Sequence, residues 1–524
     1  MAGIKRKWLK LALRRRALVS LTLIGQIALT LFLIAGPGRN LKISVWTLNI
    51  ISIIVCIYVI NKQEKPGYKL TWIFIILVFP IFGGILYILI NFWSNPKKLS
   101  RALDQNISDS REAFYYPGNR LNELIELHPE FITHAKYLQE YADFPVYGNT
   151  RQEYLALGEA YFYKVLEELK KAQKYIFLEF FILKEGLMFN SILKILERKA
   201  AEGLDVRLMY DDLGCFFTLP PDFNKNLKEK GIKTFVFNPF RPIVSSLQNN
   251  RDHRKIIAID GKVAFTGGLN LADEYINVVE RFGHWKDAAI MIEGDGAWAL
   301  TLIFLQMWNL GTKTKKDDYV SFYPWKDNVI EHTTKGVADG FEAWGYVQPY
   351  ADSPVNEENV GEHVYIQIIN QAKKYVYINT PYLIVDDNLL SALTLAAKSG
   401  VDVRIITPHR WDKWIVEITS RSYYRRLIQA GVKVYEYTSG FNHGKTFVSD
   451  DKIATVGTTN LDFRSLYLHF ECGVLIYSSQ TIAAIKEDFI TTIPVCQEMT
   501  LKDCARNAIQ RVTQDILRVF APLM

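Results

Sequence analysis

The sequence predicts an α/β protein in which one structural unit is used twice, behind an apolar N-terminal segment. Three apolar runs fill most of the first hundred residues. After them, helical patterns alternate with short β-branched and aromatic runs such as "KYIFLEFFIL" and "KYVYINTPYL", which is typical of α/β folds. Within this α/β region a single motif occurs twice, and its two histidines are 190 residues apart.

Residues 1–93 are predicted to be a membrane anchor. Its apolar runs cover residues 17–35, 43–60 and 70–92, each close to the roughly 20 residues that cross a bilayer core as a helix. We therefore expect N-terminal transmembrane helices and a multi-pass protein of the cell membrane. The side on which the rest of the chain lies stays open, because it depends on whether the first run spans the bilayer or lies in its interface.

Basic residues are concentrated in the same segment of the chain. Residues 1–101 contain 15 of the 62 lysines and arginines but only one of the 55 acidic residues, Glu64, so this segment carries +14 and the remainder −7. A positive N-terminus beside apolar runs favours contact with anionic lipid headgroups over binding of nucleic acid. The five cysteines show no paired spacing, so neither a disulfide framework nor a zinc site is predicted.

The remainder divides into a linker and two repeats. Residues 94–130 are predicted to be a polar linker, residues 131–325 the first repeat, and residues 326–524 the second repeat with a C-terminal helix. "EGLDVRLMYDD" is echoed by "SGVDVRIITPH", and "KGIKTFVFN" by "AGVKVYEYT", in the same order and at similar offsets. Collinear matches indicate a duplicated α/β unit, and we expect a pseudo-twofold axis between its copies.

Both repeats contain the pattern His-x-Lys, four residues, Asp, six residues, Gly, two residues, Asn. The residues of the first copy are His253, Lys255, Asp260, Gly267 and Asn270. Those of the second copy are His443, Lys445, Asp450, Gly457 and Asn460. The apolar "IIAI" after the first lysine predicts a strand, and residues two apart on a strand face the same way. Each repeat is therefore expected to contribute a histidine and a lysine to one half of a symmetric pocket.

These residue types point to phosphoryl chemistry. A lysine suits a phosphate and repels a divalent cation, and no further cluster of ligands completes a metal site, so no metal is expected. One neutral histidine could attack phosphorus while the other, protonated, donates to the leaving oxygen. The ordinary histidine pKa near 6.5 suits both roles at neutral pH. The two lysines would neutralise charge in the transition state.

Each histidine also needs a partner that orients its ring. "GHWKDAAIMIEG" and "YLHFECGVLIYS" align downstream of the two motifs and match Asp287 with Glu471. These carboxylates are our candidates for orienting the histidines. Asn270 and Asn460 are candidates for contacting phosphate or fixing the motif loops, and Ser465 is a weaker candidate.

The paired motifs resemble the HKD signatures of the phospholipase D superfamily. Further stretches, including "FGHWKD", "VGTTNLDFRSLYLHFE" and the terminal "RVFAPLM", are similar to bacterial cardiolipin synthases of that superfamily, from about residue 41 to the C-terminus. The resemblance implies two phospholipase D-like α/β/α repeats related by a pseudo-twofold axis. It also implies transfer of a phosphatidyl group between two phosphatidylglycerol molecules, which gives cardiolipin and glycerol through a phosphohistidine.

The resemblance further implies which residues and partners take part. His253, Lys255, Asp260, His443, Lys445 and Asp450 would form the active site, with His253 as the nucleophile. Neither a metal nor another cofactor is expected, and the partners would be phosphatidylglycerol, cardiolipin and the lipid bilayer, without nucleic acid. A homo-oligomer stays open. The 17–35 run is additional to the family pattern, and His469 stands where an asparagine is expected before "FE".

Other functions use the same residues. The same pocket could belong to a membrane-anchored phospholipase D, a phosphatidylserine synthase-type transferase or a nuclease, and the apolar runs and the acidic remainder disfavour the nuclease. A scaffold that merely binds anionic lipid would not need a histidine and a lysine in both copies. The C-terminal "RNAIQRVTQDILRVFAPLM" fits either an interfacial helix or a helix packed on the core. It places apolar residues at helical spacing: Ile509, Val512, Ile516, Val519 and Phe520.

Overall fold

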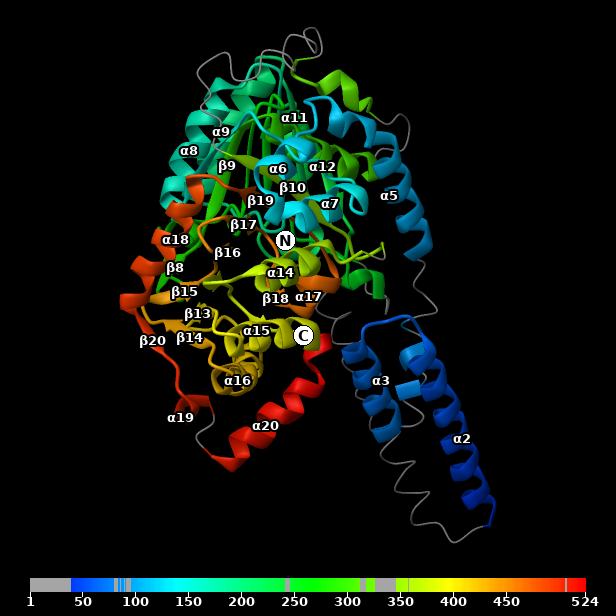
Figure 1. Ribbon diagram of the computed structural model, residues 1–524. Coiled ribbons are helices and arrows are strands. Elements are labelled where there is room, and N and C mark those ends of the chain that lie inside the picture. Colours follow the sequence, from blue (N-terminus) through cyan, green and yellow to red (C-terminus); the bar gives the residue numbers. More distant parts are fainter. Residues whose placement is uncertain are drawn as a thin grey trace. The chain divides into compact units, whose positions relative to one another are not determined.

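The computed structural model describes residues 39–524 except 80–82, 85, 89, 91–95, 241–245, 312–316, 326–344, 357 and 505–506. The described chain forms two compact units (Figure 1). The small unit contains the N-terminal residues up to Pro96 together with Phe240–Asn249 and Asp515–Met524. The large unit contains Lys97–Pro239 and Asn250–Gln514, and therefore both copies of the motif.

The small unit is built on two apolar helices, α2 (Arg39–Asn61) and α3 (Pro66–Val78). Pro66 begins α3, a position where its missing N–H is not needed. The two helices pack on each other around Val59, Ile76 and Tyr87, which are buried. In the described residues, no helix combines the length and the apolar character that a membrane crossing requires, so the predicted spans at 43–60 and 70–92 are not supported. The run at 17–35 lies outside the described residues.

Residues 97–130 are not a linker but belong to the large unit, which corrects the predicted domain organisation. This segment is helical, and polar residues that are typical of a linker are buried in it: Asn106, which is fully buried, donates to the Gln306 carbonyl oxygen at 2.8 Å. These helical segments are α5 (Pro96–Ser110), η1 (Glu112–Tyr115), α6 (Leu121–Leu127), η2 (Pro129–Phe131) and α7 (Ile132–Glu140).

The first repeat is built on a seven-stranded sheet in the order β1-β9-β7-β6-β2-β3-β4. Its strands, with the short β5 and β8 that lie outside this sheet, are β1 (Thr150–Leu155), β2 (Tyr175–Phe180), β3 (Asp205–Asp211), β4 (Lys233–Phe237), β5 (Arg251–Asp252), β6 (Ile256–Ile259), β7 (Val263–Gly267), β8 (His284–Lys286) and β9 (Ala289–Gly294). Its helices are α8 (Gly158–Lys171), α9 (Leu187–Ala201), α10 (Asp212–Cys215), α11 (Phe223–Glu229) and α12 (Asp295–Gly311), with short turns η3 (Ser246–Asn249), η4 (Asp273–Ile276) and η5 (Tyr319–Phe322).

The second repeat has the corresponding order β10-β19-β17-β16-β11-β13-β14, extended by β20. Its strands, with the short β12, β15 and β18 that lie outside this sheet, are β10 (Tyr346–Asp352), β11 (Tyr375–Asn379), β12 (Leu383–Ile384), β13 (Asp402–Pro408), β14 (Lys433–Tyr437), β15 (Gly440–Asn442), β16 (Thr446–Ser449), β17 (Ile453–Gly457), β18 (Leu461–Asp462), β19 (His469–Tyr477) and β20 (Cys496–Glu498). Its helices are α14 (Val360–Gln371), α15 (Asp387–Lys398), α16 (Trp414–Gln429), α17 (Phe463–Tyr467), α18 (Thr481–Thr492), α19 (Leu501–Cys504) and the first part of α20 (Ala508–Val519), with η7 (Ile493–Val495). The end of α20 and the turn η8 (Ala521–Leu523) belong to the small unit.

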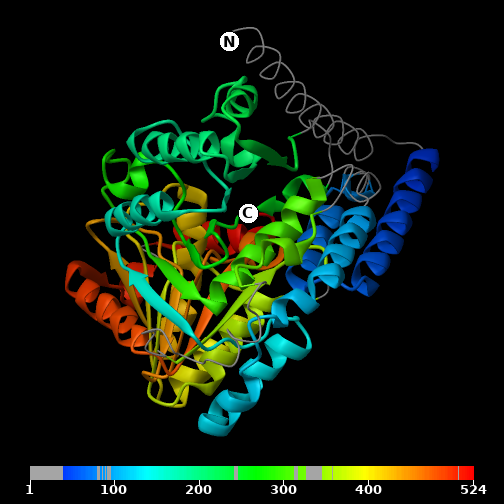
Figure 2. The same cartoon turned by 90° about the horizontal axis from the view of Figure 1, so that it is seen from above.

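The matching strand orders confirm the duplication that the sequence predicts. In each repeat three neighbouring strands run parallel to one another: β2, β3 and β4 in the first repeat, and β11, β13 and β14 in the second. The strand "YIFLEF" of β2 is buried along its whole length, which is why it reads as an unbroken apolar run. Figure 2 shows the strands inside the large unit, with α8 and α9 (teal) and α18 (orange-red) around them.

The two repeats exchange short strands with each other. Strand β5 of the first repeat pairs in parallel with the start of β19, so that Asp252 lies beside Phe470. Strand β15 of the second repeat pairs in parallel with β8, so that Asn442 lies beside Lys286. Each of these strands ends one residue before a motif histidine, and this reciprocal exchange positions the site.

Candidate active site

Each motif histidine contacts a carboxylate from the other repeat. The exchange places His253 next to Glu471, and His253 Nδ1 is 2.8 Å from Glu471 Oε1. It also places His443 next to Asp287, and His443 Nδ1 is 2.6 Å from Asp287 Oδ2. When Nδ1 donates these hydrogen bonds, the ring is fixed and Nε2 is the atom left to face a substrate.

The strand pairing holds the backbone of both histidines as well. His253 N donates to the Phe470 carbonyl oxygen at 3.0 Å, and His443 N donates to the Lys286 carbonyl oxygen at 2.6 Å. The sequence proposed Asp287 and Glu471 as partners of the histidines without saying which carboxylate meets which ring. In the structure the pairing crosses between the repeats in both cases.

The motif lysines lie beside the histidines of their own repeat. Lys255 Nζ donates to the His253 carbonyl oxygen. Lys445 Nζ donates to the His443 carbonyl oxygen and lies 2.8 Å from His443 Nδ1. Both lysine side chains are almost completely buried, at 2% exposure. In each copy the lysine therefore contacts the backbone of its own histidine, and both residues precede strand β6 or β16 rather than lying on it.

Close packing of the first motif loop brings the two repeats together. A Cβ atom at Gly268 would lie 2.0 Å from Asp287 Oδ1 and 2.9 Å from the His443 carbonyl oxygen, so no larger residue fits there. Gly267 has a φ of +156° and passes so near Ala289 that a side chain would collide with its backbone. The loop after β7 thus lies directly against the residues that hold His443.

Asp260 and Asp450 do not lie with the histidines. The Asp260 carboxylate accepts hydrogen bonds from the backbone N–H groups of Gln173, Lys174 and Tyr175, at 2.7 to 2.8 Å. Asp450 accepts the corresponding three from Lys373, Lys374 and Tyr375. Each aspartate directly follows strand β6 or β16, whereas the histidine and lysine of its motif precede that strand, so the aspartate lies at the opposite end of the strand from them.

This placement corrects the expectation that the six motif residues form one site. Asp260 and Asp450 both have positive φ values, 53° and 55°, which an aspartate tolerates in a tight turn. Their carboxylates hold the start of the neighbouring strand, β2 or β11. The geometry therefore gives the motif aspartates a role in building the sheet, apart from the histidines and lysines at the exchanged strands.

The supporting asparagines differ from each other. Asn270 Nδ2 donates to the Tyr275 hydroxyl at 2.7 Å, and its Oδ1 accepts from Ile182 N at 2.9 Å. This asparagine therefore fixes its motif loop. Asn460 is buried and its Oδ1 has no hydrogen-bond partner among the described residues, so it is the asparagine with an atom to offer a ligand. Ser465 is also buried, and its backbone N–H donates to the Asp462 carboxylate at 2.9 Å.

Burial and positive neighbours lower the histidine pKa values in the free site. Burial is the main cause for both rings, followed by Lys255 and Lys445 for His253 and by Lys445 for His443. The pKa of His443 falls to about 4, although Asp287 opposes the shift. Both rings are therefore neutral at pH 7, which differs from the ordinary pKa near 6.5 expected from the sequence.

The lysines are shifted in the same direction. Burial lowers the pKa of Lys255 to about 8 and that of Lys445 to about 7, in both cases against the attraction of Asp287 and Glu471. A site with two buried lysines and no anion is thus poorly able to keep its positive charge. A bound phosphodiester would supply the missing negative charge and restore protonation.

Three residues near His253 were not recognised from the sequence as members of the site. Arg254 connects the repeats, donating from Nε to the Glu471 carbonyl oxygen at 3.1 Å and from Nη2 to the Asp352 carbonyl oxygen at 3.0 Å. Thr458 donates from Oγ1 to Glu471 Oε2. The His469 ring lies 5.4 Å from the His253 ring, between centroids. Of these three residues, only His469 stands out in the sequence, because it replaces the asparagine that the family pattern predicts before "FE".

One group of donors could hold a metal ion. Ligand atoms of His253, His469 and Glu471 lie within 4.8 Å of one another. In this structure His253 and Glu471 already bind each other, and Lys255 adds positive charge beside them. The geometry therefore favours the histidine–carboxylate pair at this position.

The fold and this site define a phosphotransfer protein of the phospholipase D type, in which two α/β repeats each contribute a histidine and a lysine. The family described as "Cardiolipin synthase, PLD-like domain" matches residues 165–294 and 365–493, one match in each repeat. The family described as "Phospholipase_D-nuclease N-terminal" matches residues 47–90. Both matches agree with the order of the units along the chain.

Relatives cover almost the whole sequence. A cardiolipin synthase from Halalkalibacterium halodurans is 34% identical over 95% of this chain and 99% of its own length. Cardiolipin synthase 2 from Bacillus anthracis is 33% identical over 88% of both chains. An uncharacterised protein from Streptococcus mutans is 44% identical over 89% of this chain. The chain therefore belongs to the bacterial cardiolipin synthase family of the phospholipase D superfamily.

A solved structure shares the fold at lower similarity. The phosphatidylserine synthase of Haemophilus influenzae aligns with a TM-score of 0.53 at 16% identity, covering 71% of this chain and 93% of that chain. At this identity the match supports the architecture of the two repeats alone.

Proposed function

We propose that the protein is a cardiolipin synthase, an enzyme that transfers a phosphatidyl group from one phosphatidylglycerol to another and releases glycerol. The observation that carries the proposal is the pair of buried histidines, each held by a carboxylate from the other repeat and accompanied by a buried lysine. Family membership selects this reaction among those that such a site could perform.

In the first step His253 acts as the nucleophile. Its Nδ1–H donates a hydrogen bond to Glu471, so the Nε2 lone pair is free to attack the phosphorus of phosphatidylglycerol. A P–N bond forms, and the bond from phosphorus to the glycerol oxygen breaks. His443 donates its Nε2 proton to that oxygen, so glycerol leaves as a neutral alcohol.

In the second step the terminal hydroxyl of another phosphatidylglycerol attacks the phosphohistidine. His443 takes the hydroxyl proton, the P–N bond breaks, and cardiolipin and the starting His253 are formed. Lys255 and Lys445 donate hydrogen bonds to the non-bridging oxygens and balance their charge in both transition states. Two displacements at phosphorus retain its configuration.

His443 must be protonated to act as the acid, although the free site keeps it neutral. We propose that binding of the phosphodiester raises the pKa of His443, because an anion next to the ring favours its charged form. Substrate binding and proton uptake are then linked, and the acid is created only in the complex.

We propose that the apolar small unit attaches the enzyme to the membrane that contains its substrates. Transmembrane helices at 17–35, 43–60 and 70–92, the side of the catalytic unit, the absence of nucleic-acid binding and a homo-oligomer stay predictions. A cysteine introduced by Glu64→Cys, in the turn between α2 and α3, tests the topology with a membrane-impermeant maleimide. Labelling in intact cells would place this turn outside, and labelling only after lysis would place it inside.

The reaction is tested with purified enzyme and radiolabelled phosphatidylglycerol as the only lipid. Cardiolipin and free glycerol in equal amounts are the expected products. Phosphatidic acid without cardiolipin would make the protein a hydrolase and overturn the proposal. A His443→Ala variant under the same conditions should yield neither product.

A further inference from the structure

Helix α20 exposes its apolar residues and buries a polar one. Ile509, Val512 and Ile516 are 80%, 57% and 54% exposed. Gln514 is only 5% exposed, and its Nε2 donates to the Cys504 carbonyl oxygen at 2.8 Å. A helix that packs on a core shows the reverse distribution. The exposed side is therefore not the side that holds α20 to the large unit.

The exposed apolar residues form one continuous face. At 3.6 residues per turn, Ile509, Val512, Ile516 and Val519 fall within an arc of about 80°, and Gln514 points in the opposite direction. Such a narrow apolar stripe on a strongly amphipathic helix is typical of helices that lie in a membrane interface.

The end of α20 continues into an apolar region of the small unit. Thr71 Oγ1 of α3 donates to the Val519 carbonyl oxygen at 2.7 Å, and the rings of Phe74 and Phe520 are 5.6 Å apart. Leu70 of the same α3 helix is 63% exposed. Apolar exposure therefore extends from the C-terminal segment to α3, a helix of the predicted membrane anchor.

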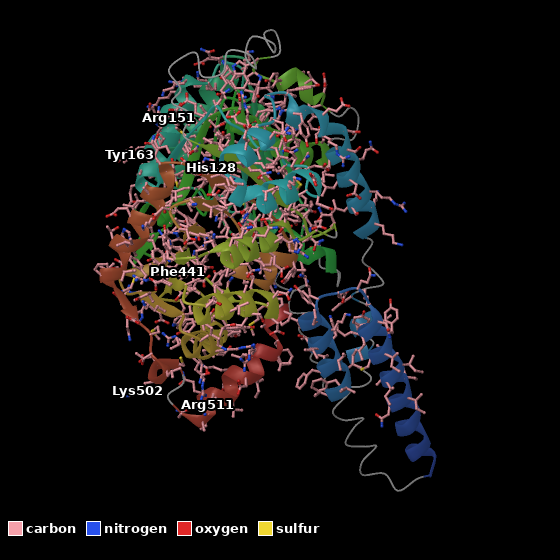
Figure 3. The ribbon with its side chains drawn as sticks, in the orientation of Figure 1. His128, Arg151, Tyr163, Phe441, Lys502 and Arg511 are labelled. Atoms are coloured by element: carbon pink, nitrogen blue, oxygen red, sulfur yellow. The ribbon has the colours of Figure 1, made fainter. Side chains whose placement is uncertain are left out.

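Charge around α20 matches an anionic surface. Residues 501–524 contain four basic and two acidic residues, a net +2, whereas residues 102–500 contain 43 basic and 52 acidic residues, a net −9. Lys502 and Arg511, both exposed, are labelled in Figure 3 at α19 and α20. Arg518 is also exposed and pairs with Asp515 at 2.7 Å. The C-terminal segment is thus net positive, whereas the chain between residues 102 and 500 is net negative.

We propose that α20 is an interfacial helix that binds the surface of an anionic phospholipid bilayer through the Ile509–Val519 stripe. Its basic residues lie at the headgroups while the stripe enters the boundary of the acyl chains. The helix thereby gives the C-terminal end of the chain its own contact with the membrane that holds the substrate, beside the apolar helices of the small unit. The inference rests on the proposed membrane location of the enzyme but not on the reaction it catalyses.

Site-specific fluorescence on the full-length protein tests this. Ile516→Cys on the stripe and Arg511→Cys on the polar side form a matched pair on the same helix. Cys496→Ser serves as background, since the other four cysteines are buried. Each variant is labelled with an environment-sensitive dye and reconstituted into vesicles of phosphatidylglycerol and phosphatidylcholine that carry lipids brominated on the acyl chain.

The dye at position 516 should shift to the blue and lose most of its emission to the brominated lipid, while the dye at 511 should do neither. Equal quenching at both positions, or none at 516, would overturn the proposal. A blue shift at 516 without quenching would mean that protein covers the stripe, and would overturn it as well. In pure phosphatidylcholine vesicles the quenching at 516 should fall severalfold, and unchanged quenching would remove the anionic preference.

Two further measurements keep the outcome clear. Circular dichroism of the labelled variants excludes unfolding as the cause of a changed signal. Cardiolipin formation by the same samples is recorded separately, so that a protein that fails to make cardiolipin but shows the 511/516 contrast contradicts the proposed reaction and supports the membrane helix.

Discussion

The exchange of carboxylates between the repeats predicts that Glu471 and Asp287 serve different chemical steps. We consider Glu471→Gln and Asp287→Asn, which keep the shape of the side chain and remove its charge. Glu471 holds the nucleophile His253 through two oxygens, at 2.8 and 3.1 Å from Nδ1. Asp287 holds the acid His443 at 2.6 Å. The two substitutions should therefore slow different steps of the reaction.

The expected size follows from the hydrogen bonds that are lost. A hydrogen bond to a charged group contributes about 1.5–3 kcal/mol, so either change should slow the affected step by about 10- to 150-fold. The loss is larger if the new amide turns its NH2 group towards Nδ1. For His253 this would move the ring proton to Nε2 and remove the lone pair that attacks phosphorus.

The assay compares two substrates that differ in their leaving group. With phosphatidylglycerol, both variants should be slow in single-turnover release of glycerol. With phosphatidyl-p-nitrophenol the leaving group needs no proton, so Asp287→Asn should recover most of the wild-type rate of nitrophenol release and Glu471→Gln should stay slow. An Asp205→Asn variant, changed at the ion pair with Arg207 outside the site, provides the control and should behave as wild type in catalysis.

Equal behaviour of the two variants with both substrates would refute the assignment of nucleophile and acid. Recovery of Glu471→Gln instead of Asp287→Asn would exchange the roles of His253 and His443. A loss below threefold in both would show that neither carboxylate orients its histidine in the reaction.

The remaining predictions concern the other motif residues. His443→Ala should abolish turnover while circular dichroism and membrane attachment stay as in the wild type, and retained activity would contradict a two-histidine mechanism. Asp260→Ala should lower the melting temperature and leave kcat largely unchanged, because it leaves three backbone N–H groups without their acceptor. A buried group without its partner costs about 1–3 kcal/mol of stability. A loss of kcat with an unchanged melting temperature would instead show that Asp260 takes part in the reaction. Affinity for phosphatidylglycerol should fall above pH 7 by up to tenfold per pH unit for each lysine that loses the proton that the bound anion requires, first Lys445 and then Lys255. An affinity that rises with pH between 7 and 9 would contradict this sign.

Much of the fold was predictable because it depends on local patterns. The alternation of helices and strands follows from periodicity within short segments, and the duplication follows from collinear matches about 190 residues apart. The structure confirms the duplication through the matching strand orders of the two sheets. The candidate carboxylates Asp287 and Glu471 were also found, because each follows its motif at a corresponding place.

The pairing across the repeats could not be read from the sequence. It depends on β5 meeting β19 and β15 meeting β8, and these are contacts between segments that lie more than 150 residues apart. The family resemblance also implied that Asp260 acts with His253, whereas strand β6 lies between the aspartate and the histidine. Burial of the whole site, which lowers the histidine pKa values, has no signature in a single sequence either.

The polar composition of residues 97–130 predicts a linker, whereas these residues belong to the large unit, and the reason is related. Asn106 and Ser110 look like residues of a linker, yet both are fully buried. Gln306 joins them, since its carbonyl oxygen accepts from Asn106 and its amide donates to Ser110 at 2.8 Å. From the sequence alone, buried polar residues that bond to a distant partner such as Gln306 look the same as polar residues exposed to solvent.

The strand exchange means that neither half of the enzyme is complete. A first repeat on its own would hold His253 without Glu471, and a second repeat on its own would hold His443 without Asp287. Two copies of a single such unit would acquire oriented rings only by associating face to face. The ancestral single-unit protein is therefore expected to have been an obligate dimer, and a chain cut between α12 and β10 should regain activity only when both fragments are expressed together.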